Sequence, residues 1–330
     1  MKPYIGITMG DAAGIGPEII LKALSDSVCY EWCNPLVIGS VDVMQKMIHL
    51  FGYPLQVHAV DDPKEGLYIH GTVDMLDVYK IESDEIFFGV ENPEYGEAAV
   101  KYTMKAGELC MEGSLQAMVS APLNKASMRM AGFHYEGQTQ ILGELTQSDN
   151  YGMILLLNDI RIMMYSTHMS LEDACKKVKR NEVLNKIKLA DAGLELFDLP
   201  EKKIAVAALN PHAGENGLFG LQEVNEISPA VKDAIGLGIN VVGPIPADTV
   251  FLKAKQKEFD LVIAMYHDQA NIAMKLLGFG EVVTLLTGLP IIRTSTGHGT
   301  AFDVAGKNVA DPTNLIEAIK CASDLGENNL

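Results

Sequence analysis

The sequence predicts an α/β protein with two domains. Apolar, strand-like runs alternate with helical segments along most of the 330 residues, which is typical of parallel sheets covered on both faces. One pair of apolar runs, 153–157 and 160–165, breaks this alternation, because the turn Asn158-Asp159 between them favours a hairpin. We therefore expect an inserted α/β domain over 126–269, with 1–125 and 270–330 forming the other domain.

Local signals justify the individual elements. A strand over 4–8 is followed by the loop Gly10-x-x-x-Gly14-x-Gly16, and Pro17 with the acidic Glu18 favours the first turn of a helix. A helix over 42–51 is expected to end at Gly52. Further helices are expected over 97–112, 171–197, 221–237 and 315–322. Further strands are expected over 35–39, 115–120, 203–209, 240–243 and 261–266.

Composition excludes some classes of partner. The net charge of −17 argues against nucleic acid and anionic membranes, because both require a basic face. No apolar run reaches the roughly 18–20 residues that span a bilayer, and no signal peptide is recognisable. The five scattered cysteines form no C-x-x-C pair, so we expect free thiols and a cytoplasmic protein.

Three histidines follow predicted strands. They are His168 after Tyr165-Ser166-Thr167, His212 in Asn210-Pro211-His212-Ala213-Gly214-Glu215, and His267 in Tyr266-His267-Asp268-Gln269. Strand carboxyl ends are where α/β proteins bind ligands, and three imidazoles suit a catalytic divalent metal. Asp248 and Asp268 are candidates for carboxylates that orient these rings. Each histidine taken alone is more often structural than a ligand.

A second cluster suits an anion. Lys275, Arg293 and His298 lie within about 25 residues, and arginine favours bidentate binding of phosphate or carboxylate. The stretch 297–307 consists mostly of small residues, so its backbone can approach a flat ligand. Three earlier segments, the glycine loop, Ser120–Ser127 with Lys125, and Gly137–Gln140, are either helix starts or further ligand contacts.

Together these motifs resemble the 4-hydroxythreonine-4-phosphate dehydrogenase family, almost from end to end. The similar segments are Gly10–Pro17, Asn124-Lys125, Gly137–Thr139, Ser166–His168, Asn210–Glu215, Gly243–Thr249, Ala264–Gln269, Gly288–Ser295 and His298–Gly306. The resemblance implies a fold like that of isocitrate and isopropylmalate dehydrogenases, with two α/β domains, an interdomain cleft, and a homodimer that completes each site.

The resemblance also implies roles for individual residues. His168, His212 and His267 would bind one divalent metal (Zn²⁺, or Mg²⁺ or Co²⁺), with His267 donated by the partner subunit. The substrate-binding residues would be Gln138, Thr139, Lys275, Thr284 and Arg293. The residues implied for NAD binding are His298, Gly299, Thr300, Asp303 and Gly306. The residues implied for catalysis are Lys275, Asp248 and Asp268.

The implied reaction is NAD-dependent oxidation at C3 of a 4-phosphorylated 3-hydroxy acid, followed by loss of CO2. Two positions depart from the common family pattern: Gln138 stands where His is usual, and Thr284 where Asn is usual. The segment Ser120–Lys125 resembles the sugar-acid branch, which acts on 4-phospho-D-threonate or 4-phospho-D-erythronate and gives dihydroxyacetone phosphate. Changes in polar contacts are where such selectivity would lie, and we expect this branch. Oxidation of 4-phosphohydroxy-L-threonine in vitamin B6 biosynthesis is the alternative. A non-catalytic ligand-binding protein and a metal-dependent acyltransferase or hydrolase remain as hypotheses of other classes.

Overall fold

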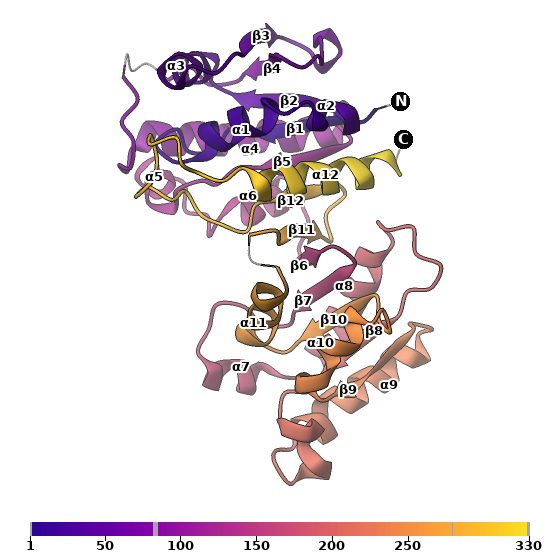
Figure 1. The fold of residues 1–330 in the computed structure, drawn as a ribbon. Coiled ribbons are helices and arrows are strands. Elements are labelled where there is room, and N and C mark those ends of the chain that lie inside the picture. The colour runs from indigo at the N-terminus through magenta and orange to yellow at the C-terminus, as the bar shows by residue number, and fades with distance from the viewer. Residues whose placement is uncertain (1, 82–84, 279, 329–330) are drawn as a thin grey trace. The chain divides into compact units, whose positions relative to one another are not determined.

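A computed structural model of the protein describes residues 2–81, 85–278 and 280–328. The chain divides into two compact units, which we call unit 1 (1–149 and 289–330) and unit 2 (150–288) (Figure 1). Both boundaries lie further along the chain than the predicted 125/126 and 269/270. The first differs because α5 (Lys125–Met130) and α6 (Gln138–Leu145) pack against α4 (Pro93–Met111) of unit 1. The second differs because β11 (Val283–Thr287) pairs with β6 (Gly152–Leu157) of unit 2.

Unit 1 is built on a parallel sheet with the strand order β3-β4-β2-β1-β5-β12. Its strands are β1 (Tyr4–Thr8), β2 (Asn34–Gly39), β3 (Gln56–Val60), β4 (Thr72–Asp77), β5 (Ala117–Ser120) and β12 (Arg293–Ser295). Its remaining helices are α1 (Gly16–Leu24), α2 (Val28–Trp32), α3 (Val41–Phe51), α12 (Thr313–Glu327) and the short η1 (Pro63–Glu65). Helices α4 and α12 both pack on β1 and β5, so the middle of the sheet is buried.

The local signals in unit 1 act as the sequence predicts. Strand β1 has the predicted bounds, and Ile5 and Ile7 are fully buried in it, each side chain contributing about 1.5–3 kcal/mol. Helix α3 begins where the Ser40 side chain accepts a hydrogen bond from the Val43 N–H. It ends at Gly52, whose φ of 70° is easily adopted only by glycine.

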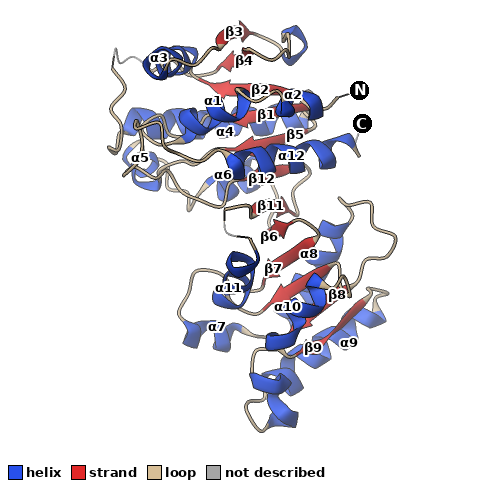
Figure 2. Cartoon of the chain, viewed as in Figure 1, coloured by secondary structure: helices blue, strands red, loops and turns tan. Residues whose placement is uncertain are grey.

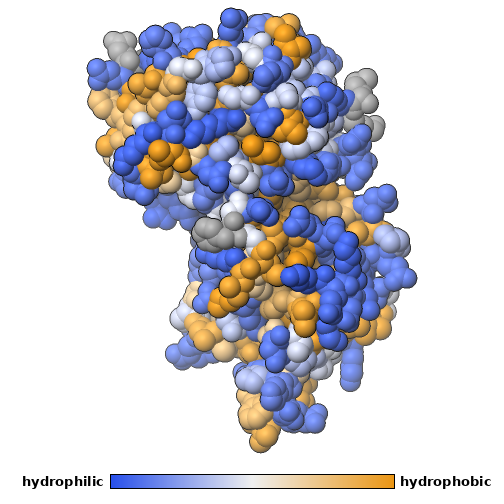
Figure 3. Space-filling model, viewed as in Figure 1, coloured by the Kyte–Doolittle hydropathy of each residue, from blue (hydrophilic) through white to orange (hydrophobic). Residues whose placement is uncertain are grey.

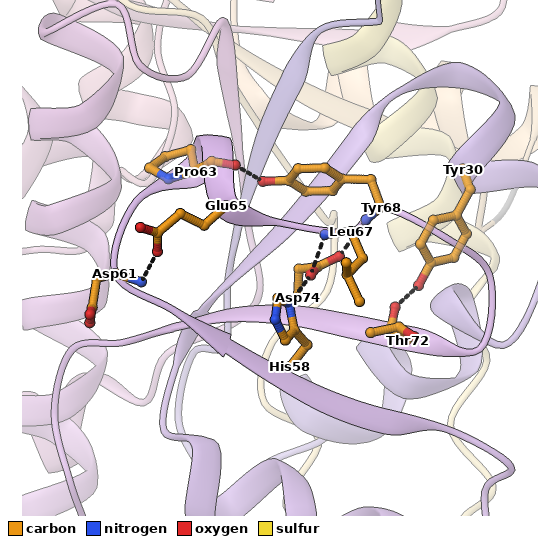
Figure 4. Close-up of polar contacts among 9 residues, drawn as sticks. All are labelled: Tyr30, His58, Asp61, Pro63, Glu65, Leu67, Tyr68, Thr72 and Asp74. Carbon is orange, nitrogen blue, oxygen red and sulfur yellow. Dashed lines mark hydrogen bonds and ion pairs between the residues drawn. The ribbon is translucent and has the colours of Figure 1, made fainter.

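Strands β3 and β4 form one edge of the unit 1 sheet, and a buried carboxylate organises it (Figure 4). Asp74 Oδ1 accepts hydrogen bonds from the Leu67 N–H at 2.9 Å and from His58 Nδ1 at 2.7 Å, while Oδ2 accepts one from the Tyr68 N–H at 2.8 Å. The loop between the two strands is thereby fixed to β4. Neither strand was predicted, although Val73 and Met75 alternate with polar residues in β4.

Unit 2 has a mixed sheet with the strand order β11-β6-β7-β10-β8-β9 (Figure 2). Strands β11, β6 and β7 are antiparallel neighbours, which confirms the predicted hairpin, and the remaining pairs are parallel. The other strands are β7 (Ile160–Met164), β8 (Ile204–Ala207), β9 (Val241–Ile245) and β10 (Leu261–Ala264). The helices are α7 (Leu171–Lys177), α8 (Arg180–Leu194), α9 (Ser228–Gly236), α10 (Ala247–Lys255), α11 (His267–Leu277), the short η2 (Pro211–Gly217) and the π-helical η3 (Glu223–Ile227).

The long helix predicted over 171–197 is divided into α7 and α8, whereas the helix predicted over 221–237 is continuous but has a π-helical first part, η3. Val178, which ends α7, has the extended ψ of 105°, so α8 starts as a separate helix.

Across the described residues, no helix is both long and apolar enough to cross a membrane. No disulfide joins the five cysteines, all of which lie in the described part of the chain.

Candidate functional site

The first candidate site lies in unit 1 around Arg293, the first residue of β12. This side chain is only 5% exposed. Its Nε donates a hydrogen bond to Ser120 Oγ at 3.0 Å, and its Nη2 donates one to Gln138 Oε1 at 2.6 Å. Both partners are neutral, and no ion pair of Arg293 is found among the described residues.

The electrostatics of Arg293 favour an anionic ligand. Burial lowers the pKa of its guanidinium to about 10, so the group stays charged at neutral pH. A buried charge is costly unless an opposite charge and hydrogen bonds compensate for it. The neutral partners supply hydrogen bonds alone, and an anion would supply the missing charge.

Arg293 opens onto a pocket of about 180 Å³. The wall combines the ends of β5 and β12 with the start of α6, and it is lined by Ser120, Ala121, Pro122, Leu123, Lys125, Gly137, Gln138, Thr139, Arg293, Ser295, Thr296, His298 and Gly299. Ser120 ends β5 and Ser295 ends β12, so part of the pocket lies at the carboxyl ends of parallel strands, the usual binding edge of such a sheet. Lys125 adds a second cation and Thr139 a hydroxyl. We call this the anion pocket.

Gln138 lines the anion pocket, but its amide is already engaged. Its Oε1 accepts from Arg293, and its Nε2 donates to the Ala121 carbonyl at 2.9 Å. The amide therefore orients the guanidinium. The sequence predicted a helix start or a substrate contact at Gln138, but not its contact with Arg293, because the two residues are 155 positions apart.

Two of the predicted substrate residues belong to unit 2 and do not line the anion pocket. Thr284 is buried in β11, where it pairs with Leu155 of β6. Lys275 is exposed in the last turn of α11. The structure thus brings together Gln138, Thr139 and Arg293, and it adds Lys125, which the sequence singled out without assigning it a role.

The predicted NAD-binding stretch lies against the glycine loop of unit 1. The Ile15 N–H donates to the Thr300 carbonyl at 3.0 Å, and a Cβ on Gly14 would lie 2.9 Å from that oxygen. Only glycine allows this approach. His298 and Gly299 also line the anion pocket, whereas Asp303 is exposed and Gly306, with φ of 76°, packs on Phe88. The two segments therefore form one surface.

Asp11, inside the glycine loop, is fully buried. Its Oδ1 accepts a hydrogen bond from the Ala13 N–H at 2.8 Å. Desolvation nevertheless raises the pKa of this carboxyl to about 6, so it is ionised in the folded protein only above mildly acid pH.

The second candidate site lies in unit 2, where His168 and His267 meet. The two residues follow the adjacent parallel strands β7 and β10, and their ring centroids are 5.7 Å apart. They line a pocket with Thr167, Met169, Leu171, Ala174, Tyr266 and Asp268. Asp268 Oδ1 lies 2.7 Å from His267 Nδ1, which favours the tautomer that leaves Nε2 free for a metal. We call His168 and His267 the histidine pair.

His212 does not join the histidine pair. It follows β8, the strand next to β10, but it is exposed in η2 and its ring contacts Phe219. Its Nδ1 lies 3.2 Å from Oε1 of Glu215, three residues further along the chain. We did not predict this contact. No cluster of three His, Cys, Asp or Glu side chains able to hold a metal exists among the described residues.

The contribution of His267 by a partner subunit stays a prediction. Within one chain, His267 lies beside His168. His212 is the histidine that stands apart. Asp248, at the exposed start of α10, shows no hydrogen bond to any of the three rings among the described residues, whereas Asp268 has the orienting contact that was expected of it.

Comparison with known proteins agrees with these features. The sequence profile described as "Pyridoxal phosphate biosynthetic protein PdxA" matches residues 31–322. A 4-hydroxythreonine-4-phosphate dehydrogenase of Desulforapulum autotrophicum is 41% identical over 98% of this chain and 95% of its own length. A Symbiobacterium thermophilum protein named "Putative D-threonate 4-phosphate dehydrogenase" is 44% identical over 97% of this chain and 95% of its own.

Solved structures give the same result. The crystal structure of 4-hydroxythreonine-4-phosphate dehydrogenase from Klebsiella pneumoniae superposes with a TM-score of 0.93, at 36% identity, over 98% of this chain and 99% of that chain. The predicted α/β fold is confirmed, and the chain belongs to the PdxA family of dehydrogenases.

Proposed function

We propose that this protein is a metal- and NAD-dependent dehydrogenase that oxidises and decarboxylates a 4-phosphorylated 3-hydroxy acid. The observation that carries the proposal is Arg293, a buried cation whose partners in its pocket are neutral. A phosphate or carboxylate bound there would accept charge-assisted hydrogen bonds from the guanidinium. Lys125 and Thr139 would complete the contacts to that anion, because both line the same pocket.

The donor set of unit 2 fits a divalent cation. Two imidazoles lie close enough to contact one ion, and Asp268 orients one of them. When bound, the cation would lower the pKa of the substrate hydroxyl, and NAD would accept the hydride. His168 and His267 would hold the metal, while His298, Gly299, Thr300, Asp303 and Gly306 would hold the dinucleotide.

The third metal ligand in this proposal is His212 of a second copy of the chain, in a homodimer with shared sites. The support is that His212 stands apart from the histidine pair within one chain. Exposed hydrophobic side chains follow it in the chain, and one of them, Phe219, contacts its ring: Leu218, Phe219, Leu221 and Val224 are 47–75% exposed. They belong to the segment between β8 and α9, which lies at the lower end of the view, where orange and blue atoms are mixed (Figure 3). Several exposed hydrophobic side chains on one segment are typical of a protein interface.

Within the family we favour a sugar-acid phosphate, 4-phospho-D-threonate or 4-phospho-D-erythronate. Gln138, at a departure from the common family pattern, sets the orientation of Arg293 and so affects what the pocket accepts. The similarity to the Symbiobacterium protein supports this branch. The similarity to the Desulforapulum enzyme supports the alternative, 4-phosphohydroxy-L-threonine. Catalytic roles for Lys275 and Asp248 stay part of the proposal.

The test is NADH formation by the purified protein with added Zn²⁺, Mg²⁺ or Co²⁺ and each of the three substrates separately. Turnover of a sugar-acid phosphate alone is the expected result. Turnover of the amino acid alone would assign the protein to the biosynthetic reaction. Binding of all three without NADH formation would favour a ligand-binding protein, and substrate consumption without NAD would favour an acyltransferase or hydrolase.

A further inference from the structure

The segment that carries His212 has an unusual backbone. His212, Ala213, Gly214, Glu215 and Asn216 are consecutive residues with φ between 44° and 78°, in the left-handed region. Residues other than glycine avoid this region, and it is normally visited by single residues. We call 212–216 the left-handed turn. A conformation this unfavourable persists only where neighbouring groups hold it in place.

Glu223 is the group that holds the base of this turn. Its side chain is 2% exposed. Its Oε1 accepts hydrogen bonds from the Leu209 N–H at 2.8 Å and the Asn210 N–H at 2.7 Å, and its Oε2 accepts one from Asn210 Nδ2 at 2.8 Å. These contacts fix the chain at the two residues that precede Pro211 and His212.

The turn itself packs against the same carboxylate. A Cβ on Gly214 would lie 2.8 Å from Glu223 Oε2, so only glycine fits there at φ of 78°. Gly220 closes the other side, because a Cβ on it would lie 2.4 Å from Asn210 Nδ2. The carboxylate is thus enclosed by the turn whose base it binds.

The helix that supplies Glu223 is also irregular. Glu223 is the first residue of the π-helical η3, which continues directly into α9. Single π-helical turns are rare and often occur at functional sites. A buried carboxylate needs compensating donors, and Glu223 obtains them from the strand end that leads to His212.

We infer that Glu223 is a positioning residue that fixes the left-handed turn and thereby the direction in which His212 is presented. The inference rests on the proposed function in one respect, that His212 is a metal ligand. Glu223 makes no contact with the metal in this account and acts only through Asn210 and the turn. Neutralising or removing its carboxylate should therefore weaken metal binding without removing a ligand.

The experiment compares Glu223→Gln with Glu226→Gln in the full-length protein. Glu226 lies on the same π-helical turn, but its carboxylate accepts from the Arg180 N–H at 2.8 Å, on a different segment from 209–216. The two readouts are the affinity for Co²⁺ by titration and the amide hydrogen exchange of 209–217. Glu223→Gln should bind Co²⁺ about tenfold more weakly and exchange faster in this segment. Glu226→Gln should match the unaltered protein in both readouts.

A charge-conserving double variant separates positioning from simple loss of structure. In Asn210→Asp/Glu223→Gln, the amide and the carboxylate exchange places. The amide oxygen introduced at position 223 can still accept from the backbone, and its nitrogen can donate to the carboxylate introduced at position 210. Recovery of Co²⁺ affinity in the double variant supports the inference. A double variant that folds and exchanges slowly but still binds weakly would overturn it, as would an unchanged Co²⁺ affinity and exchange rate in Glu223→Gln.

His212→Ala distinguishes this inference from the proposed function. If Co²⁺ affinity is unchanged in His212→Ala, His212 is not a ligand and the metal assignment fails. The exchange of 209–217 in Glu223→Gln then still reports whether Glu223 holds the turn. If His212→Ala loses the metal while Glu223→Gln keeps both metal and slow exchange, the metal site stands and the inference fails.

Discussion

The two candidate sites differ in how much of each lies within one folded unit. The anion pocket has a buried cation, two neutral hydrogen-bond partners and a second cation, all contributed by unit 1. The histidine pair of unit 2 has two imidazoles and an orienting carboxylate, while the third expected ligand stands apart. The groups that we propose for anion binding thus all belong to unit 1, whereas the proposed metal site needs a ligand beyond the histidine pair.

The difference has a physical basis. A charged pocket needs only a few convergent donors, and here β5, the neighbouring β12 and the starts of α5 and α6 supply them. A metal needs three or more ligands at about 2 Å, which is a stricter geometric condition. In unit 2 the third strand end leads into a left-handed turn that carries its histidine away from the pair. The predictions below test this contrast, beginning with the largest effect.

His168→Ala should lower kcat/KM by about a thousandfold, because it removes one of the two clustered histidines that we propose as metal ligands. The protein should also lose Co²⁺ affinity in a titration. His134→Ala is the matched control, since His134 is exposed in the loop between α5 and α6. Equal activity of the two variants would show that the histidine pair is not a metal site.

Arg293→Met should raise KM for the phosphorylated substrate by about a hundredfold, since charge-assisted hydrogen bonds to the anion are lost. Thermal unfolding without ligand should occur at the same or a higher temperature, because a desolvated charge is replaced by an apolar side chain. Arg129→Met, at an exposed position of α5, is the control. An unchanged KM in Arg293→Met would place the anion elsewhere.

Asp11→Asn should stabilise the protein more at pH 7 than at pH 4. The folded-state pKa of Asp11 is raised to about 6. Below the unfolded-state pKa of about 4 the carboxyl is neutral in both states, so its burial does not lower the free energy of unfolding. As the pH rises from 4 through 6 the carboxyl ionises more readily in the unfolded protein, and the fold is destabilised. The gain in unfolding free energy should grow by about 3 kcal/mol over this interval. Denaturant unfolding of both proteins measures it, and a gain independent of pH would contradict the buried charge.

Gln138→Glu should raise KM by about tenfold, the smallest of these effects. The new carboxylate would pair with Arg293 and compete with the substrate anion for it. Gln140→Glu makes the same change two residues along α6, where the side chain accepts from the Glu136 N–H. If Gln138→Glu has the same KM as Gln140→Glu, the side chain at position 138 does not affect how Arg293 binds the substrate anion.

Sequence reasoning succeeded where local signals or strand ends decide the structure. The hairpin at Asn158-Asp159, the first turn of α1 with Pro17 and the end of α3 at Gly52 each follow from nearby residues. Arg293 and the three histidines stood out because polar residues follow apolar runs there. The predicted fold class and family are confirmed for the same reason: many short motifs occur in order.

What the sequence did not predict depends on contacts between distant segments. The roles of Gln138 and Glu223 arise from partners 155 and 13–14 residues away in the chain. The left-handed turn has one glycine among five residues, so composition does not indicate it. The domain boundaries differed because the packing of α5 and α6 on α4, and the pairing of β11 with β6, are tertiary events.

The most direct test of the central claim is a complementation assay between two inactive variants. His168→Ala and His212→Ala proteins are mixed, unfolded partially to exchange subunits, and assayed for NADH formation. If His212 of one chain completes the histidine pair of another, mixed dimers contain one intact site, and about a quarter of the unaltered activity should return. If all three ligands act within one chain, or if His267 is the donated ligand, every mixed site lacks a histidine and no activity would return.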